Sequence, residues 1–356
     1  MLKEILDTDV LIVGAGIAGL SLSYFLSKKD VNIIIIDKKE KIGYPIRDTG
    51  LVSNKIFNLL PVSKNIILKK YKKAIFYNRG SSFEVIARNS YMVLLNRPML
   101  DIQIYEKIKE KINVLLKEEL KYIKNRKIAV TNNRRINYKV IVDATGPFGL
   151  VRKLYGLKNI KNFVIGMEIH TKDIKENDIK IFLDKKFSKE YFGWVVGYDE
   201  YSLVGIIDKN LNINRFLFFI KRFGIKKYDY FYSDIIKNKP EKILSKDNMI
   251  SVGESTGYLK QFSLGGIIYS IIQAKIASEI IYKYLTYNVS LKLYDKIIYY
   301  LFHRYLVWAN FIRILLKNKI IFEILKTIKA NKIVSNMDLD FYTIRAGGDS
   351  NPRPAG

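Results

Sequence analysis

The strongest constraint on the fold is a glycine-rich turn at residues 14–19, G-A-G-I-A-G, which lies between two regular patterns. The apolar residues 10–13 before it are typical of a buried parallel strand, and residues 20–26 after it are typical of a helix. In this context Gly14 permits a tight turn, Gly16 lets a pyrophosphate approach the backbone, and Gly19 lets helix and strand pack closely. The helix would present unpaired N–H groups and its positive dipole end to the phosphates.

A second apolar run, residues 31–36, ends in Asp37, which lies 18 residues after Gly19. A carboxylate at this position can accept hydrogen bonds from both ribose hydroxyls of a nucleotide, and it would repel a 2′-phosphate. NADP is therefore disfavoured at this site. A glycine-rich turn that binds no ligand is the alternative interpretation, but the strand, the helix and the acid together favour a dinucleotide.

Two later turns distinguish FAD from NAD as that dinucleotide. The short strand predicted for residues 140–142 runs into the turn that contains Asp143 and Gly146. Another short strand, residues 249–252, ends in Gly253 and Glu254. The glycine lets the chain turn beneath a ligand, and the carboxylate of Glu254 can bind a ribityl hydroxyl. A ribityl chain is present in FAD and absent from NAD, so these turns favour FAD as the cofactor.

The remaining FAD segments are a glycine pair and an arginine. Gly265 and Gly266 precede a long apolar helix predicted for residues 267–285, and their N–H groups can face the edge of the flavin ring, where charge collects on reduction. Arg97 lies within residues 95–101, just before another predicted helix. In this order and at these separations, each segment can hold a different part of one FAD molecule.

The composition excludes several kinds of site. The chain has no cysteine, which removes disulfides, thiolate nucleophiles, iron–sulfur ligands and thiolate zinc sites. The two histidines, His170 and His303, lie far apart in the sequence, so no metal site is expected. His170 lies in a strand-like alternation and is interpreted as an ordinary sheet residue.

The net charge of +27 has two explanations. The lysines are spread over the whole chain among many Ile, Asn, Tyr and Phe residues, as expected from an A/T-rich genome, and no nucleic-acid-binding module is recognisable. We therefore expect no nucleic-acid partner. The charge can also attract the protein to an anionic lipid surface, by roughly 1 kcal/mol per suitably placed basic residue. The two explanations are compatible with each other.

The sequence has no pattern of a signal peptide or a spanning helix. Residues 1–8 are short and polar, and no run of 18 uncharged apolar residues occurs. We expect a cytoplasmic protein, with peripheral contact to a membrane as a further expectation.

The predicted fold class is α/β: an FAD-binding Rossmann-type domain with an inserted antiparallel-sheet substrate domain and C-terminal helices. Residues 1–150 form the first part of the FAD-binding domain, and residues 248–285 form its second part. The strand-rich residues 151–247 form the substrate domain between them. Helices are expected over residues 289–333, and the polar residues 345–356 are expected to be a disordered tail.

The C-terminal helices have two interpretations. Leu301, Tyr305, Trp308, Ile312 and Leu315 have the spacing of one helix face. The simpler interpretation is a helix pair that covers the substrate cavity. The alternative is an interfacial amphipathic segment that admits a lipid.

Over about residues 8–285 these segments resemble the p-hydroxybenzoate hydroxylase-like flavoproteins, and most closely the geranylgeranyl reductase family, including archaeal enzymes that saturate isoprenoid ether lipids. Residues 42–53, I-G-Y-P-I-R-D-T-G-L-V-S, resemble the segment that passes near the flavin in that family. Asp48 occupies the place where the family often has cysteine, and Glu254 replaces its usual aspartate. The aromatic motif Tyr/Phe-x-Trp-x-Phe-Pro is half matched, by Phe192 and Trp194.

The resemblance implies an FAD-dependent oxidoreductase that reduces isoprenoid double bonds of membrane lipid precursors. Reduced FAD would give a hydride to one carbon, and a proton would be added to its neighbour. The resemblance places Arg97 near the flavin's linker. It also makes Phe192 and Trp194 candidates for lining the pocket, with core packing as the equal alternative. Asp48 is either the proton donor or a turn residue that accepts from nearby N–H groups.

The expected partners are a polyprenyl lipid substrate and an external electron donor that docks transiently, because the chain is too short for a second dinucleotide domain after residue 285. Two other functions remain open at this point. One is an FAD-dependent monooxygenase that acts on an aromatic or apolar substrate. The other is a flavin-binding paralogue without lipid reductase activity.

Overall fold

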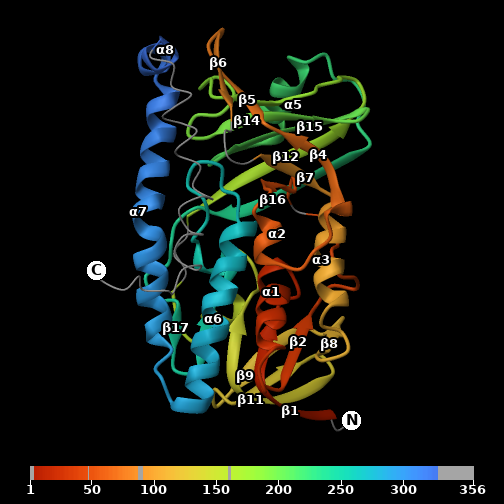
Figure 1. The fold of residues 1–356 in the computed structure, drawn as a ribbon, viewed down its shortest axis with the longest axis vertical. Helices are drawn as coiled ribbons and strands as arrows, with labels where there is room; N and C mark the ends of the chain where they lie inside the picture. Colours follow the sequence, from red (N-terminus) through yellow and green to blue (C-terminus); the bar gives the residue numbers. More distant parts are fainter. Residues whose placement is uncertain (1–3, 47, 87–90, 159–161, 328–356) are drawn as a thin grey trace, which may run out of the picture.

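The computed structural model describes residues 4–46, 48–86, 91–158 and 162–327, and every structural statement below concerns these residues. They form two large sheets, a small one, and helices that run between and beside them (Figure 1). The predicted α/β class with a Rossmann-type domain, an antiparallel sheet and C-terminal helices is confirmed.

The first sheet has a parallel centre made of buried apolar runs. Its order is β17-β18-β11-β1-β2-β8, and β10 and β9 continue from β11 as an antiparallel extension. Residues 10–12 of β1 and 140–142 of β11 are completely buried, because long helices cover one face of the sheet and the antiparallel extension with a short helix covers the other. The strands are β1 (Glu4–Val13), β2 (Ile33–Asp37), β8 (Asn113–Leu116), β9 (Leu120–Lys124), β10 (Ile128–Thr131), β11 (Arg134–Asp143), β17 (Ser245–Lys246) and β18 (Met249–Ser251).

The second sheet is largely antiparallel, with the order β16-β12-β15-β14-β13-β5-β6. It contains the four strands that the sequence pattern predicts over residues 163–171, 179–183, 192–196 and 202–207. It also contains β16 and the hairpin β5–β6, which the pattern did not indicate, and β5 lies parallel to β13. This sheet therefore takes strands from within the first 150 residues. Its strands are β5 (Lys73–Asn78), β6 (Ser81–Ile86), β12 (Phe163–Thr171), β13 (Ile179–Phe182), β14 (Phe192–Tyr198), β15 (Tyr201–Asp208) and β16 (Tyr230–Lys237).

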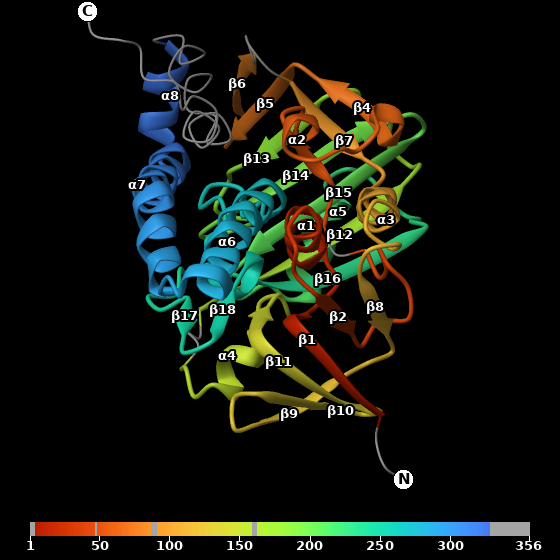
Figure 2. The ribbon, with the colours of Figure 1, turned by 60° about the horizontal axis from the view of Figure 1, so that its bottom comes forward.

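Short elements join the two large sheets. A three-stranded sheet consists of β3 (Leu51–Ser53), β7 (Met92–Leu95) and β4 (Ile67–Tyr71). The shorter helices are α2 (Ile56–Leu59), α3 (Arg97–Glu106), α4 (Leu150–Leu154), α5 (Ile213–Lys221) and the 3-10 turns η1 (Lys64–Ile66) and η2 (Gly253–Thr256). Helices α1 (Ile17–Leu26) and α6 (Ile267–Tyr287) lie side by side over the parallel strands (Figure 2).

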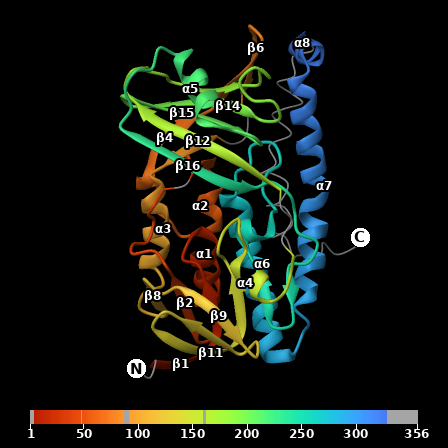
Figure 3. The same ribbon diagram turned by 180° about the vertical axis from the view of Figure 1, so that it is seen from behind.

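The C-terminal helices are α7 (Lys292–Lys317) and α8 (Lys319–Thr327). Helix α7 runs along one side of the molecule, from the parallel sheet to the hairpin β5–β6, in both the front and the back views (Figures 1 and 3). Within the described part of the chain, no helix combines the length and the apolar character needed to cross a membrane. Residues 328–333 of the predicted helical segment and the predicted tail, residues 345–356, lie outside the described residues.

The buried stripe of α7 is displaced from the face proposed from its spacing. The side chains turned inward are Ile298, Phe302, Leu306 and Leu316, all at most 4% exposed. Trp308, which was placed on the shared face, is 49% exposed. The spacing could not choose between two neighbouring stripes because aromatic and aliphatic residues occur on both sides of this helix.

Candidate cofactor and substrate site

Strand register brings the predicted cofactor segments to one edge of the parallel sheet. Val13 of β1 pairs with Ile36 of β2 and with Asp143 of β11. Asp143 in turn pairs with Ser251 of β18. All four strands are parallel, so their carboxyl ends lie together, which is where open α/β sheets bind ligands. The turns that follow them contain the glycines and acids identified in the sequence.

Three of these glycines are required by close backbone contacts. Gly14 has φ +113°, and a Cβ there would lie 2.2 Å from the carbonyl oxygen of Ala144. A Cβ on Gly19 would lie 1.9 Å from the carbonyl oxygen of Gly14. Gly253, with φ +71°, approaches Ala18 of α1, where a Cβ would be 2.5 Å from the Ala18 Cβ. The glycine-rich turn at residues 14–19 is thus packed against the turn after Asp143 and the turn at Gly253.

Gly16 and Gly146 are different, because a Cβ on either would meet no atom of the described residues within 4 Å. Gly16 also has ordinary extended backbone, with φ −89° and ψ −173°. Packing of the protein therefore does not require a glycine at position 16. An approaching phosphate would require one, so the open space matches the role predicted for Gly16.

Helices α1 and α6 both begin at this edge with a glycine N-cap. Gly16 precedes α1 and Gly266 precedes α6, and no side chain among the described residues caps either helix. The N–H groups of a first helical turn have no partner within their own helix. Both N-termini can therefore donate to an anionic group, such as a pyrophosphate or the electron-rich edge of a reduced flavin.

Asp37, predicted to bind the ribose hydroxyls, also accepts hydrogen bonds from the protein backbone. Its Oδ2 accepts from Ala15 N (2.7 Å) and its Oδ1 from Lys39 N (2.9 Å). The Lys39 ammonium lies 3.7 Å from Oδ2. Each carboxylate oxygen retains further acceptor capacity. The carboxylate therefore orients the glycine turn and can still accept from ribose hydroxyls.

Asp143 stabilises the turn that follows β11 through hydrogen bonds to its buried carboxylate. It is completely buried, and its carboxylate accepts from Thr145 N (3.1 Å), Thr145 Oγ1 (2.6 Å) and Arg152 N (2.8 Å). It therefore shapes the turn that exposes Gly146. Glu254 is partly buried and accepts from Lys237 N at 3.2 Å.

Arg97 forms one ion-pair cluster with the buried Asp101 and the partly exposed Asp48. Arg97 Nε donates to Asp48 Oδ2 at 2.8 Å, and Arg97 Nη1 lies 2.8 Å from Asp101 Oδ1. Burial alone would lower the pKa of Arg97, but the two carboxylates outweigh it and raise that pKa above its ordinary value. Asp48 Oδ1 also accepts from Gly50 N at 2.9 Å. An Asp48 that accepts from a nearby backbone N–H group is what its interpretation as a turn residue expects.

Phe192 and Trp194 lie on one face of β14 beside the loop that leads to α6. Phe192 stacks on Phe262, with ring centroids 6.0 Å apart, and meets Trp194 edge to face, also at 6.0 Å. Phe262 lies a few residues before Gly265 and Gly266. The two predicted aromatics and Phe262 therefore form an aromatic wall next to one of the cofactor loops.

The wall departs from the aromatic motif for a steric reason. Gly197 stands where the motif has proline, and a Cβ there would lie 1.8 Å from the carbonyl oxygen of Glu176. Gly197 O also accepts from the Tyr71 hydroxyl at 2.6 Å. A proline at this position would displace the segment around Glu176. The end of β14 therefore cannot carry the proline of the aromatic motif without that change.

Sequence reasoning missed Glu168, whose buried carboxylate accepts from Trp194 Nε1 at 2.6 Å. It also missed Thr49 and Tyr232, which donate to the same carboxylate. An acid inside the otherwise apolar strand β12 was the available signal. His170, interpreted as an ordinary sheet residue, lies two residues farther along the strand, with Nε2 3.6 Å from Glu168 Oε1.

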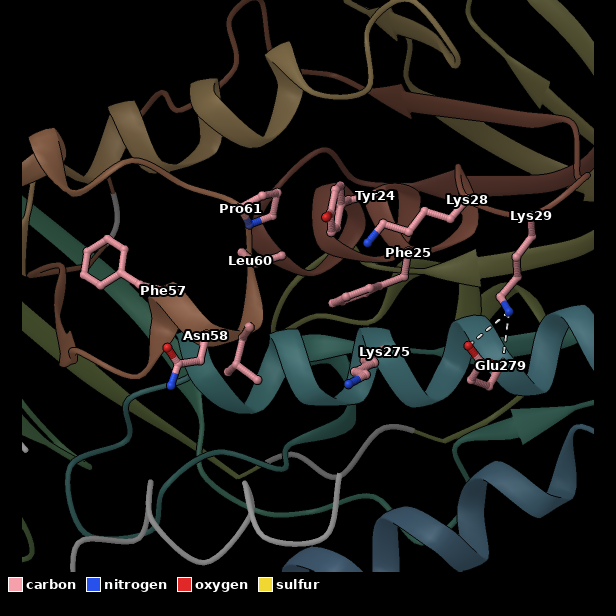
Figure 4. A pocket seen from close by; sticks show the side chains of 11 residues that line it. Tyr24, Phe25, Lys28, Lys29, Phe57, Asn58, Leu60, Pro61, Lys275 and Glu279 are labelled. Carbon is pink, nitrogen blue, oxygen red and sulfur yellow. Dashed lines mark hydrogen bonds and ion pairs between the residues drawn. The ribbon is translucent and has the colours of Figure 1, made fainter. Parts of the chain in front are cut away.

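A separate open cleft of about 530 Å³ lies between α1, α2 and α6 (Figure 4). It is lined by Tyr24 and Phe25 from the C-terminal half of α1 and by Lys28 from the turn that follows, with Lys29 paired to Glu279 at its rim. These residues lie at the end of α1 opposite Gly16. We assign it no part in cofactor binding.

Comparisons with known proteins bear on the fold and the type of cofactor. Residues 12–63 match the family described as the NAD(P)-binding Rossmann-like domain. An uncharacterised protein of Methanocaldococcus jannaschii is 29% identical over 82% of this chain and 79% of its own length. Digeranylgeranylglycerophospholipid reductase 1 of Methanosphaera stadtmanae is 22% identical over 77% of this chain and 75% of its own. The chain is thus similar in sequence to both proteins over most of its length.

Solved structures show the same fold. A geranylgeranyl bacteriochlorophyll reductase-like protein of Thermoplasma acidophilum superposes with a TM-score of 0.80 over 96% of this chain and 95% of its own, at 18% identity. A probable FAD-dependent monooxygenase of Pseudomonas aeruginosa superposes at 0.67 over 87% and 96%, at 12% identity. The chain therefore has the fold of FAD-dependent oxidoreductases, as the sequence predicted.

Proposed function

We propose that this enzyme binds FAD and reduces carbon–carbon double bonds of a polyprenyl chain on a polar or anionic head, such as a geranylgeranylated glycerolipid. The observation that carries the proposal is that the loops assigned to the cofactor contact the aromatic wall. The loop at Thr49 contacts the wall through Glu168, and the loop before Gly265 contacts it through Phe262. The relationship to lipid reductases supports the choice of substrate.

When bound, FAD supplies the hydride for the reduction. The protein's part is to bind, orient and exclude water. The open backbone at Gly16 and the N-terminus of α1 would hold the pyrophosphate, and Asp37 would accept from ribose hydroxyls. Gly265 and Gly266 bring the N-terminus of α6 to the ring, where its dipole favours negative charge.

The aromatic wall holds the alkene. An isolated alkene offers no polar handle, so alignment and a dry pocket must supply the catalysis. Phe192 is buried and Trp194 is partly buried, and both present apolar ring surface to a chain. Electrons reach the flavin from an external donor that docks transiently.

The direct test is mass spectrometry of lipids after incubation with dithionite-reduced enzyme. Wild type should add two hydrogens for each double bond reduced. Trp194→Ala should lower turnover by about tenfold or more and raise the substrate concentration required, while it retains FAD, since loss of the partly buried indole removes roughly 1–3 kcal/mol of contact. Unchanged geranylgeranyl lipid together with oxygen-dependent oxidation of an aromatic compound would instead identify a monooxygenase.

The exposed surface of α7 and α8 supplies the lipid-facing part of the proposal. Tyr300 is 85% exposed and Ile320 is 72% exposed, and Trp308, Phe311 and Ile314 are about half exposed. Exposed basic residues lie among them, including Arg304 and Lys319. Aromatic and aliphatic side chains flanked by cations are suited to an anionic lipid surface. We propose that this face rests on the membrane that holds the substrate.

Vesicle binding tests this contact. The enzyme should co-sediment with phosphatidylglycerol vesicles and not with phosphatidylcholine vesicles. Trp308→Ala combined with Phe311→Ala should weaken binding by about tenfold, because two partly inserted rings are lost. Tyr122→Ala removes a similarly exposed ring from β9 and should change nothing. Equal binding by the double variant and the wild type would contradict the proposal.

A further inference from the structure

A row of four residues crosses the substrate sheet on the face that bears the aromatic wall. Tyr232 of β16 pairs with Glu168 of β12, Glu168 pairs with Gly205 of β15, and Gly205 pairs with Trp194 of β14. Directly paired residues in neighbouring strands point to the same face. Trp194 and Glu168 are therefore two strands apart, with only a glycine between them.

The glycine lets the indole cross the gap. A Cβ on Gly205 would lie 2.2 Å from Cζ2 of Trp194, so the ring lies directly over this position. Across it, Trp194 Nε1 donates to Glu168 Oε2 at 2.6 Å. The ring is thus fixed at both ends, by its own strand and by a hydrogen bond to a carboxylate two strands away.

The carboxylate of Glu168 is 2% exposed. Oε2 also accepts from Thr49 Oγ1 at 2.6 Å, and Oε1 accepts from the Tyr232 hydroxyl. Burial raises the pKa of Tyr232 above its ordinary value, and the charge of Glu168 adds to this, so the phenol remains a donor. Burying a carboxylate is costly unless such donors surround it, and charge-assisted bonds are among the strongest available.

The same carboxylate joins the two halves of the site. Thr49 follows Asp48, which pairs with Arg97 at the start of α3. A chain of polar contacts therefore runs from the wall through Glu168 and Thr49 into the cofactor-binding part of the molecule. On the other side, the wall is held by apolar packing, including the contact of Phe192 with Phe262.

We propose that Glu168 is the positioning residue of the substrate wall: it holds the Trp194 indole over Gly205 and locks the wall to the Thr49 loop. This inference rests on the proposed function, since it assigns to one residue the alignment of the alkene with the hydride source. Without the carboxylate, the indole rotates and the wall is released from the loop. FAD remains bound, because the dinucleotide turns at Gly16 and Asp37 do not touch Glu168.

The first test needs no substrate. The chain has two tryptophans, so in a Trp308→Phe background all tryptophan emission comes from Trp194. Glu168→Gln keeps the size of the side chain but replaces one acceptor oxygen with an NH2 group, which cannot accept the hydrogen bonds that the carboxylate accepts. We expect several-fold greater acrylamide quenching of Trp194 and unchanged flavin content. Glu200→Gln, at an exposed position, is the matched control. Unchanged quenching in Glu168→Gln overturns the proposal.

The second test separates positioning from general damage. Glu168→Gln and Trp194→Phe should each raise KM and lower kcat, and the double variant should be no worse than the poorer single variant, because both break one interaction. Thr49→Val, which removes the loop's donor, should give a smaller loss in the same direction. Additive losses overturn the proposal. If wild type reduces no lipid, the proposed function fails, while the quenching result still decides the role of Glu168.

Discussion

Gly16→Val should abolish FAD binding and leave the fold intact. Position 16 has extended backbone and open space on the Cβ side, so a valine fits the protein without a clash. The same side chain would occupy the space that the pyrophosphate needs. We expect affinity to fall by at least about 100-fold, or about 3 kcal/mol, with little change in the thermal unfolding midpoint of the apoprotein. Flavin absorbance after desalting and apoprotein melting are the measurements.

Two further variants serve as comparisons, one with a smaller expected effect on FAD binding and one with an expected effect on folding. Gly16→Ala should weaken FAD binding less than valine does, since a single methyl intrudes less. Gly19→Val should fail to fold, because even its Cβ would be 1.9 Å from the Gly14 carbonyl oxygen. If Gly16→Val retains full FAD, the turn does not hold the pyrophosphate and the cofactor assignment loses its main support.

Local pattern was enough to predict the cofactor edge. Apolar runs that end in glycine turns predict where parallel strands stop, and the register of β1, β2, β11 and β18 then brings those turns together. The strands of the substrate sheet were predicted for the same reason, since alternation is a local property. Their residue ranges agree closely, as β12 at Phe163–Thr171 illustrates.

The carboxylate at the centre of the wall could not be predicted in this way. Its partners Thr49, Trp194 and Tyr232 are separated by up to 183 positions. Cross-strand register places Trp194 and Tyr232 beside it, and the loop at Thr49 reaches it from outside this sheet. The pairing of Asp48 with Arg97 is also non-local. Both residues had been identified separately, but a sequence gives no sign that one charge neutralises the other.

Helix α7 supplies another contact that the sequence conceals, through the buried Lys317. Its side chain is 6% exposed, and its ammonium donates to the backbone carbonyls of Leu183 (3.1 Å), Ser188 (2.8 Å) and Tyr191. Nearby, the Arg313 guanidinium lies 3.6 Å from the centre of the Tyr191 ring. These contacts attach the end of α7 to the segment before β14, which carries the wall.

Lys317→Met should destabilise the protein by about 2–4 kcal/mol at neutral pH, because buried carbonyls lose their donor. Burial lowers the pKa of Lys317 to about 8, against about 10.4 in the unfolded chain. Between these values the unfolded state binds the extra proton, so the Lys317 contribution to the unfolding free energy rises with pH. Below about pH 8 it is constant.

The loss caused by Lys317→Met should therefore grow by about 3 kcal/mol as pH rises from about 8 to about 10.5. Urea unfolding of both proteins across this range measures the difference and cancels the titration of the many shared lysines. Lys296→Met, at an exposed position on the same helix, should show neither the loss nor its pH dependence. A pH-independent difference would mean that Lys317 titrates normally in the folded protein. A variant as stable as wild type would mean that α7 is not held to the wall through this ammonium.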